Sequence, residues 1–263
     1  MSISNTPRSE TPRVSVVVPF FNSARHLEAC IDSLRNQRDV GGPFEIILIN
    51  NGSEDESPQI AERYDDVILL EESRPGAYAA RNTGIRRASA PILAFTDADC
   101  IVAPDWLRSI QDGLTDPSRA ILLGHFRYPQ SASWPLHWLG AYENAKTDYV
   151  LRHCSRDHHF AYANNMAVRA SVFQELGLFK EWRRAADSEL VHRLARHQPD
   201  LEVAYWPSMK VTHLEFVRAT KRVQRLSLYT QTNTKIETFR ELGLHQRLGV
   251  LFFLLRRHLF RRH

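Results

Sequence analysis

Short hydrophobic runs, separated by polar segments, dominate the first hundred residues of the chain. Residues 13–20 (RVSVVVPF) and 44–50 (FEIILIN) are aliphatic or β-branched over most of their length, which is typical of strands buried on both faces of a parallel sheet. Residues 66–72 and 91–97 predict two further strands. Apolar residues at helical spacing predict intervening helices over 23–37, with Ser23 as N-cap, and over 57–64 and 76–89.

Strands that alternate with helices indicate an α/β protein with a parallel sheet. Right-handed crossovers would place the carboxyl ends of the strands at one edge, where open α/β sheets bind their ligands. Polar side chains follow the predicted strands there, namely Asn22, Asn50, Asn51, Asp97 and Asp99. The pattern therefore predicts a ligand site at this edge of the sheet.

The second half of the chain has a less regular pattern. We expect a helix over 103–114, a strand over 121–128, a strand, turn and helix within 162–177, a helix over 185–197, and strands over 201–207 and 210–216. Residues 130–160 are rich in Trp, Tyr and His, and their poor periodicity predicts no element. Trp134 and Trp138 are partly at helical spacing; such aromatic residues usually belong to a core, and contact with an acceptor is the less common alternative.

The charge of the chain is unevenly distributed. Its 263 residues carry 34 Lys and Arg against 30 Asp and Glu, for a net charge of +4. Residues 214–263 hold 11 of the basic and 3 of the acidic side chains, which leaves the rest of the chain with an excess of four acidic groups. An acidic body argues against a nucleic-acid-binding face, which needs clustered Lys and Arg.

Cysteine usage and the chain ends favour a cytoplasmic protein. The three cysteines, Cys30, Cys100 and Cys154, form no CxxC pair, so we expect neither a disulfide framework nor a zinc knuckle. Residues 1–12 are polar and are expected to be a flexible leader without a secretory signal. The apolar run 248–255 (LGVLFFLL) is far shorter than the roughly 20 residues of a membrane-spanning helix.

Two carboxylates separated by one residue, Asp97-Ala98-Asp99, directly follow the predicted strand over 91–97. Such a pair can hold Mg²⁺ or Mn²⁺, and the cation would bridge it to a diphosphate. The alternative is a turn, because Asp is common where backbone groups need a hydrogen bond. The position at the ligand edge favours the metal.

These segments together resemble glycosyltransferase family 2, which has the GT-A fold. The resemblance rests on 14–22 (VSVVVPFFN), 45–55 (EIILINNGSED), 74–85 (RPGAYAARNTGI), 92–107 (ILAFTDADCIVAPDWL), 164–179 (NNMAVRASVFQELGLF) and 186–194 (ADSELVHRL). It implies a mostly parallel, open sheet flanked by helices, with a GT-A domain over 13–215. Within it, residues 13–100 would be the Rossmann-like nucleotide-sugar half and 101–215 the acceptor half. Residues 216–263 would form a basic, amphipathic helical tail.

The resemblance also implies roles for individual residues. Asp187 would be the catalytic base, and Asp97, Asp99 and His213 would hold the divalent metal, Mn²⁺ or Mg²⁺. The sugar nucleotide would contact Pro19, Phe20, Asn22, Asn50, Asn51, Arg81, Asp97, Ala98, Asp99 and Arg193. On the acceptor side we expect Trp134, Trp138, Asn165 and Glu189.

Two departures from the family pattern and several alternatives remain. Asn50-Asn51 stands where the family commonly has acidic residues, which leaves the nucleotide base open, and Ala186 replaces the first acidic residue of the base segment. Asp187 could instead cap its helix, with Glu189 or Glu181 serving elsewhere. His213 could simply be packed. Arg81 could form a surface ion pair, and Arg193 could pair with Glu189 at i,i+4.

The resulting hypothesis is an inverting, metal-assisted glycosyltransferase that uses a nucleotide-diphosphate sugar, with a UDP-sugar favoured. Its acceptor would be a glycan or a lipid-linked glycan of polysaccharide or cell-envelope synthesis, an expectation by analogy. A catalytically inert scaffold is the alternative, and an oligomer is compatible with either. A sugar-nucleotide pyrophosphorylase is disfavoured because PFFNSAR lacks a Gly-rich phosphate loop. Residues 244–263 could hold the enzyme on the inner membrane face, or pack on their own domain or a second subunit.

Overall fold

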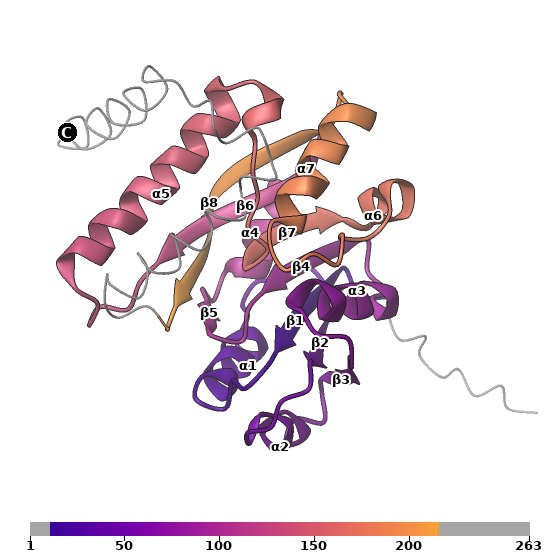
Figure 1. Ribbon diagram of the computed structural model, residues 1–263, viewed down its shortest axis with the longest axis vertical. Helices are drawn as coiled ribbons and strands as arrows, with labels where there is room; N and C mark the ends of the chain where they lie inside the picture. The colour runs from indigo at the N-terminus through magenta and orange to yellow at the C-terminus, as the bar shows by residue number, and fades with distance from the viewer. Residues whose placement is uncertain (1–10, 216–263) are drawn as a thin grey trace, which may run out of the picture.

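The fold is a single curled sheet with helices on both faces (Figure 1). The computed structural model describes residues 11–215. The expected tail over 216–263, which includes the segment 244–263 considered for membrane binding, and most of the expected leader lie outside the described residues. The strands are β1 Val14–Phe20, β2 Phe44–Asn50, β3 Ile68–Glu71, β4 Ile92–Thr96, β5 Cys100–Val102, β6 Arg119–Arg127, β7 Asn165–Arg169 and β8 Glu202–His213. The α-helices are α1 Leu27–Arg35, α2 Ser57–Glu62, α3 Ala77–Arg87, α4 Trp106–Gly113, α5 Trp134–His153, α6 Ala170–Leu176 and α7 Ala186–His197, with a 3₁₀ turn η1 over Arg156–His158.

The sheet order is β3-β2-β1-β4-β7-β6-β8-β5. The first four strands pair in parallel, as predicted from their continuous apolar runs. Beyond β4 the sheet is mixed, because β7 is antiparallel to both β4 and β6, and β5 is antiparallel to β8. β6 and β8 pair in parallel, so parallel pairings outnumber antiparallel ones, as expected, but the parallel run is continuous only through the first four strands.

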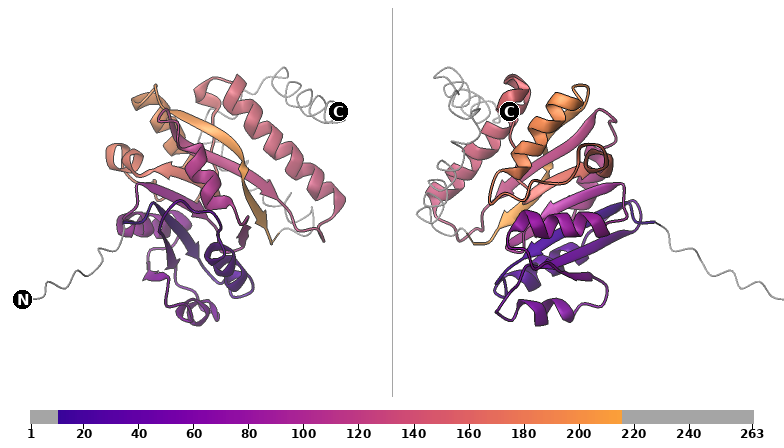
Figure 2. Two further views of the ribbon diagram at one scale, coloured as in Figure 1. Left: turned by 180° about the vertical axis from the view of Figure 1, so that it is seen from behind. Right: turned by 45° about the vertical axis from the view of Figure 1, so that its right-hand side comes forward.

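Two hydrophobic cores separate the sheet from its helices (Figure 2). Helices α1 and α4 cover one face, where Leu27, Ile31 and Trp106 are completely buried. Helices α3, α6 and α7 cover the other, with Phe95 and Leu190 at its centre. Burial of apolar surface on both faces explains why β1 and β2 contain hardly any polar residue.

Residues 130–160, for which no element was predicted, contain the 20-residue helix α5. Its inner face is partly polar: Asn144, Thr147 and Asp148 are all buried. The Asn144 side chain accepts a hydrogen bond from the Phe126 backbone N–H at 2.9 Å and donates one to its carbonyl oxygen at 2.8 Å. Because polar side chains replace apolar ones on the buried side, the helix has no hydrophobic stripe that periodicity could detect.

Three further differences concern element boundaries. The two strands expected over 201–207 and 210–216 are one strand, β8, which absorbs an irregularity in its pairing with β6. The three-residue strand β5 was not predicted, because so short a segment carries no pattern. Helix α1 begins at Leu27, and Ser23 acts through its carbonyl oxygen, which accepts the His26 and Leu27 N–H groups at 2.9 Å, rather than as a side-chain cap.

Gly84 allows α3 to approach the sheet closely. A Cβ atom at this position would lie 2.5 Å from Cγ1 of Val17 and 2.8 Å from Cδ1 of Ile49. Alanine favours a helix over glycine by about 1 kcal/mol, but overpacking typically costs about 1–3 kcal/mol.

We therefore expect Gly84→Ala to lower the free energy of unfolding, measured by urea titration. Gly41→Ala, whose Cβ would meet only Gln111 at 3.4 Å, is the control; equal midpoints for the two variants would contradict the close approach.

Candidate active site

A buried ion pair joins the aspartate motif to α3. Asp97 follows β4, and its carboxylate oxygen Oδ1 pairs with Nη2 of Arg81. The Arg81 side chain is only 6% exposed, so the surface ion pair considered as an alternative is excluded. Burial disfavours the charged guanidinium, but Asp97, Tyr78 and Asp187 more than offset it and raise the pKa of Arg81. Arg81 therefore stays charged between two carboxylates.

Asp187 is a buried carboxylate that is held from three sides. It lies in the first turn of α7 and is 8% exposed. Its Oδ2 accepts the Ala163 N–H at 3.0 Å, its Oδ1 accepts the Ser188 N–H at 2.9 Å, and the Tyr78 hydroxyl donates to the same carboxylate. Burial raises the pKa of Asp187, whereas these hydrogen bonds and the charge of Arg81 oppose that shift. A carboxyl with a raised pKa and a fixed orientation suits proton transfer.

The helix that carries Asp187 begins at an unusual backbone conformation. Ala185 precedes α7 with φ 65° and ψ 16°, in the left-handed region, which costs a residue with a Cβ atom roughly 1–2 kcal/mol. No side chain caps this helix end. Asp187 is therefore not the N-cap, and the capping alternative considered for it does not apply.

Asp99 and His213 can hold a metal between them. Oδ2 of Asp99 lies 3.6 Å from Nδ1 of His213, and Sγ of Cys100 completes a group whose ligand atoms lie within 4.8 Å of one another. Burial, together with the carboxylates of Asp99 and Asp97, raises the pKa of the Cys100 thiol well above its ordinary value. Asp99 and His213 offer a carboxylate oxygen and an imidazole nitrogen as donors. This donor set fits Mn²⁺.

The asparagines predicted to bind the nucleotide organise the loops at the sheet edge. The Asn51 amide donates to the carbonyl oxygens of Glu72 and Arg74 at 2.8 and 2.7 Å, and its oxygen accepts the Gly76 N–H at 2.8 Å. Oδ1 of Asn22 accepts the Glu54 N–H at 2.8 Å. Both side chains are used by the protein, so they shape the nucleotide loops rather than present free hydrogen-bonding groups.

Asn50 is likewise bound within the protein. Its side chain donates to Glu71 at 3.1 Å and accepts the Ser53 N–H at 2.9 Å. Asp55, which was not predicted as a site residue, accepts the Ala24 N–H at 3.0 Å and also binds Ser57. It thereby ties the loop after β2 to the one after β1. The sequence does not reveal this role of Asp55, because an acidic residue in a turn is common and its contact with the loop after β1 is visible only in the folded structure.

The two adjacent phenylalanines at the end of β1 differ in their exposure to solvent. Phe20 and Pro19 are buried at the end of the strand, whereas Phe21, just beyond it, is 59% exposed. The exposed ring at the ligand edge is therefore that of Phe21, and not that of Phe20 as predicted from the sequence. Ala98, between the two aspartates, is also buried.

Arg193 serves the loop between α6 and α7. It pairs with Glu189 at 3.0 Å, as the i,i+4 alternative predicts, and donates to the carbonyl oxygens of Leu176 at 2.6 Å and Leu178 at 2.9 Å. Similarly, the Asn82 amide exchanges two hydrogen bonds with the Phe179 backbone, at 2.9 and 3.1 Å. Nucleotide binding by Arg193 stays a prediction, and the structure favours the positioning alternative.

The residues expected on the acceptor side are not brought together. Asn165 is completely buried: it accepts a hydrogen bond from the Trp106 indole at 2.9 Å and donates to the Met209 and His125 carbonyl oxygens. It supports β6, β7 and β8 and cannot touch an acceptor directly. Trp134 and Trp138, in contrast, are 74% and 52% exposed near the start of α5. They line an apolar surface groove with Leu139 and Tyr142.

Tyr78 is the most consequential residue that sequence reasoning missed. It lies on α3 three residues before Arg81, whose guanidinium carbon is 5.3 Å from its ring centre. The family resemblance covers this segment but marks no function for a tyrosine there. Only the packing of α3 against α7 reveals that its hydroxyl reaches Asp187.

Solved structures share this architecture. A mannosyltransferase from Pyrobaculum calidifontis, PcManGT, in complex with GDP-Man and Mn²⁺, matches 78% of this chain and 57% of its own with a TM-score of 0.59 at 24% identity. TarS 1–349 from S. aureus in complex with UDP-GlcNAc matches 77% of this chain and 58% of its own with a TM-score of 0.61 at 16% identity. The fold is thus that of the GT-A glycosyltransferases.

Sequence comparison identifies the family. The model of glycosyl transferase family 2 matches residues 15–177, and the chain belongs to that family. Glycosyltransferase AglE of Haloferax volcanii is 30% identical over 178 residues, which are 65% of this chain and 57% of AglE. A validoxylamine A glucosyltransferase of Streptomyces hygroscopicus is 31% identical over 122 residues, 44% of this chain and 29% of that enzyme. The chain thus spans little more than half of AglE.

Among residues 11–215, no helix combines the length and the hydrophobicity needed to cross a membrane.

Proposed function

We propose that the enzyme transfers a sugar from a nucleotide-diphosphate donor, with a UDP-sugar favoured, to a hydroxyl of a glycan or lipid-linked acceptor, with inversion at the anomeric carbon. The observation that carries this proposal is the line of charged groups at one sheet edge. Asp97 pairs with Arg81, Arg81 also lies within electrostatic range of Asp187, and Asp99 faces His213. Diphosphate and acceptor would meet between these groups.

Asp187 would act as the general base. Its carboxylate would take the proton of the acceptor hydroxyl as the oxygen attacks the anomeric carbon opposite the leaving diphosphate, which inverts that centre. The hydrogen bonds from Ala163, Ser188 and Tyr78 fix the direction of the carboxylate. Fixed geometry reduces the entropy lost on reaching the transition state.

Asp99 and His213, with Asp97 beside them, would hold the divalent metal, Mn²⁺ being favoured by the imidazole ligand. Bound there, the cation would supply charge stabilisation for the diphosphate leaving group. Arg81 keeps the Asp97 carboxylate oriented at the end of β4. The Mn²⁺ that accompanies GDP-Man in the PcManGT complex supports such a site.

Phe21 would stack on the nucleotide base, since its ring is exposed at the end of β1. The loops tied by Asn22, Asn50 and Asn51 would shape the surrounding pocket. Because these amides are used within the protein, base selection would come mainly from backbone groups and from shape. The UDP-GlcNAc and UDP complexes of TarS support the preference for UDP.

The exposed groove of Trp134 and Trp138 would receive the acceptor, through stacking on sugar rings or contact with a lipid. Arg127 at the end of β6 pairs with Thr212, next to His213, and the segment that follows Arg127 leads to α5. An acceptor of cell-envelope polysaccharide synthesis at the inner membrane face would fit this groove. The inert-scaffold alternative is disfavoured because buried charges such as Arg81 and Asp187 are costly to retain without a task.

A donor panel tests the function. We expect tight, Mn²⁺-dependent binding of a UDP-sugar, measured by calorimetry, followed by slow hydrolysis or transfer. Asp99→Ala should weaken binding in the presence of metal but leave metal-free binding unchanged, because it removes a ligand only. Failure of every nucleotide diphosphate to bind, with or without metal, would sink the enzyme proposal and favour the scaffold.

Asp187→Asn tests the base. The amide preserves the shape but cannot accept a proton, so kcat should fall by about 10²–10⁴-fold while the Kd of the donor stays the same. Asp112→Asn, which alters an exposed ion pair with Arg108 on α4, is the matched control and should transfer normally. Normal turnover in Asp187→Asn would show that another group accepts the proton.

Tyr78→Phe tests how the base is tuned. Because burial raises the pKa of Asp187, activity should fall with decreasing pH at a pH above the ordinary aspartate value. The Tyr78 hydroxyl favours the ionised carboxylate, so its removal should move this acid limb to higher pH without changing the donor Kd. Tyr64→Phe removes a similar bond, 3.1 Å to exposed Asp32, and should leave the kcat–pH profile unchanged. Superimposable profiles for both variants would exclude tuning by Tyr78.

A further inference from the structure

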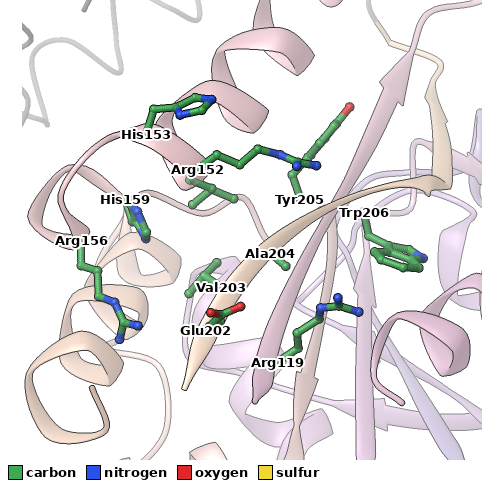
Figure 3. A pocket seen from close by; sticks show the side chains of 11 residues that line it. Arg119, Arg152, His153, Arg156, His159, Glu202, Val203, Ala204, Tyr205 and Trp206 are labelled. Carbon is green, nitrogen blue, oxygen red and sulfur yellow. The ribbon is translucent and has the colours of Figure 1, made fainter. Parts of the chain in front are cut away.

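A second cavity lies at the opposite end of the sheet from the carboxylates. Its volume is about 520 Å³, within the range of roughly 300–1,000 Å³ that small-molecule sites occupy. The walls come from the first half of β8, the start of β6, the end of α5 and the turn that follows it (Figure 3). No group assigned to sugar transfer lines it.

The distance along β8 separates this cavity from the proposed metal site. The cavity is lined by residues 202–206, whereas His213 ends the same strand. Because β8 is irregular between Trp206 and Lys210, the separation is counted along its partner β6: Arg119 and Gly124, opposite Glu202 and Trp206, lie eight and three residues before Arg127, which is opposite Thr212. At about 3.3 Å per residue, the lining residues lie roughly 10–26 Å from the end of β8. A ligand in the cavity would therefore be distinct from the sugar nucleotide.

Three arginines from three different elements surround the cavity. Arg119 begins β6, Arg152 lies in the last turn of α5 and Arg156 in η1, while Glu202 is the one lining carboxylate. Figure 3 shows the three guanidinium groups on different sides of the cavity. Three cations against one carboxylate give the lining an excess of positive charge, which suits an anionic ligand such as a phosphate.

Existing contacts hold each arginine but do not exhaust its donors. Nη1 of Arg119 donates to the Gly113 carbonyl oxygen at 3.2 Å, and its guanidinium carbon lies 5.1 Å from the Trp206 ring centre. Arg119 also lies 3.5 Å from Asp116. Nη1 and Nη2 take part in these contacts, so Nε is the nitrogen of Arg119 that lies outside them.

The other two arginines are held in the same manner. Nη1 of Arg156 donates to the carbonyl oxygens of Pro199 and, at 3.1 Å, Leu201. Nε of Arg152 pairs with Asp148, and its side chain is 62% exposed. In both residues Nη2 takes no part in these contacts. The arginines are thus fixed in position with N–H groups left for a ligand.

His159 supplies an independent sign of a missing ligand. The residue lines the cavity and is only 7% exposed. One ring nitrogen bonds the Cys154 backbone carbonyl oxygen, while Nε2 is buried and has no hydrogen-bond partner among residues 11–215. A buried polar atom without a partner costs free energy. Burial lowers the pKa of His159, and a neutral ring whose other nitrogen donates to a carbonyl oxygen leaves Nε2 as an acceptor, so a hydroxyl of a ligand in the cavity would provide the partner.

We infer that this cavity binds the phosphate group of a second, anionic ligand: a phosphate monoester, carried either by a small molecule or by a lipid headgroup. Arg119, Arg152 and Arg156 would supply the positive charge that attracts the phosphate, with Arg152 and Arg156 offering Nη2 as donors, and Nε2 of His159 would accept a hydrogen bond from a hydroxyl of the same ligand. The site goes beyond the proposed sugar transfer and does not depend on it.

Calorimetry with inorganic phosphate as the probe tests the site, with EDTA present so that no metal bridges phosphate to Asp99. We expect saturable binding that Arg152→Gln weakens at least about tenfold, the effect of one charge-assisted hydrogen bond. Arg108→Gln is the matched control, because Arg108 forms the same kind of exposed i,i+4 pair with an aspartate. The imidazole NMR signal of His159 should shift on titration in the wild type.

Vesicles distinguish the two sources of phosphate. If phosphate alone does not bind, but Arg152→Gln weakens co-sedimentation with vesicles that contain phosphatidic acid, whose headgroup is a phosphate monoester, relative to phosphatidylcholine vesicles, the ligand is a lipid headgroup. Binding of both probes that is indifferent to Arg152→Gln and to Arg156→Gln would overturn the inference. So would phosphate binding that Arg81→Gln abolishes, since the phosphate would then occupy the donor site. Thermal unfolding of each variant confirms that it is folded.

Discussion

Arg81 is a buried cation, and Asp97 is the carboxylate that compensates its charge. A buried ion pair is costly to form but far more costly to break, because the remaining partner would be left uncompensated in a medium of low polarity. The pair joins the end of β4 to α3, and Tyr78 on the same helix reaches Asp187 on α7. One electrostatic contact thus connects the donor side of the site with the proposed base.

The first half of the fold could be predicted from the sequence because its strands are buried on both faces. β1 and β2 are apolar at all positions except Ser15, Glu45 and Asn50, and this local composition determines their place in the sheet. The second half depends on contacts between distant segments. The inner face of α5 is polar, and Asn144 on it binds the backbone of β6, so the sequence of the helix shows no hydrophobic periodicity. The sequence of β7 likewise does not reveal that this strand inserts antiparallel between β4 and β6.

The same limit applies to the site. The positions of Asp97, Asp99 and Asp187 follow from motif spacing, because the chain itself places them at strand or helix ends. Whether a polar side chain faces the ligand or the protein is decided by packing. The side-chain amide of Asn51 is hydrogen-bonded to a neighbouring loop. That of Asn165 on β7 is hydrogen-bonded to β6 and β8, although both residues look like ligand-binding groups in the sequence.

Ala185, the residue before α7, has a left-handed backbone conformation next to the proposed base Asp187. A glycine would adopt its left-handed conformation without steric cost, and many other residues could continue the chain in a relaxed turn. The strained entry into α7 instead turns Asp187 inward, toward Ala163 and Tyr78. The fold gives up a little conformational stability to aim a carboxylate, a trade between robustness and activity that is common at functional positions. The backbone at Ala185, together with the groups that bond Asp187, therefore belongs to the structure that orients the proposed base.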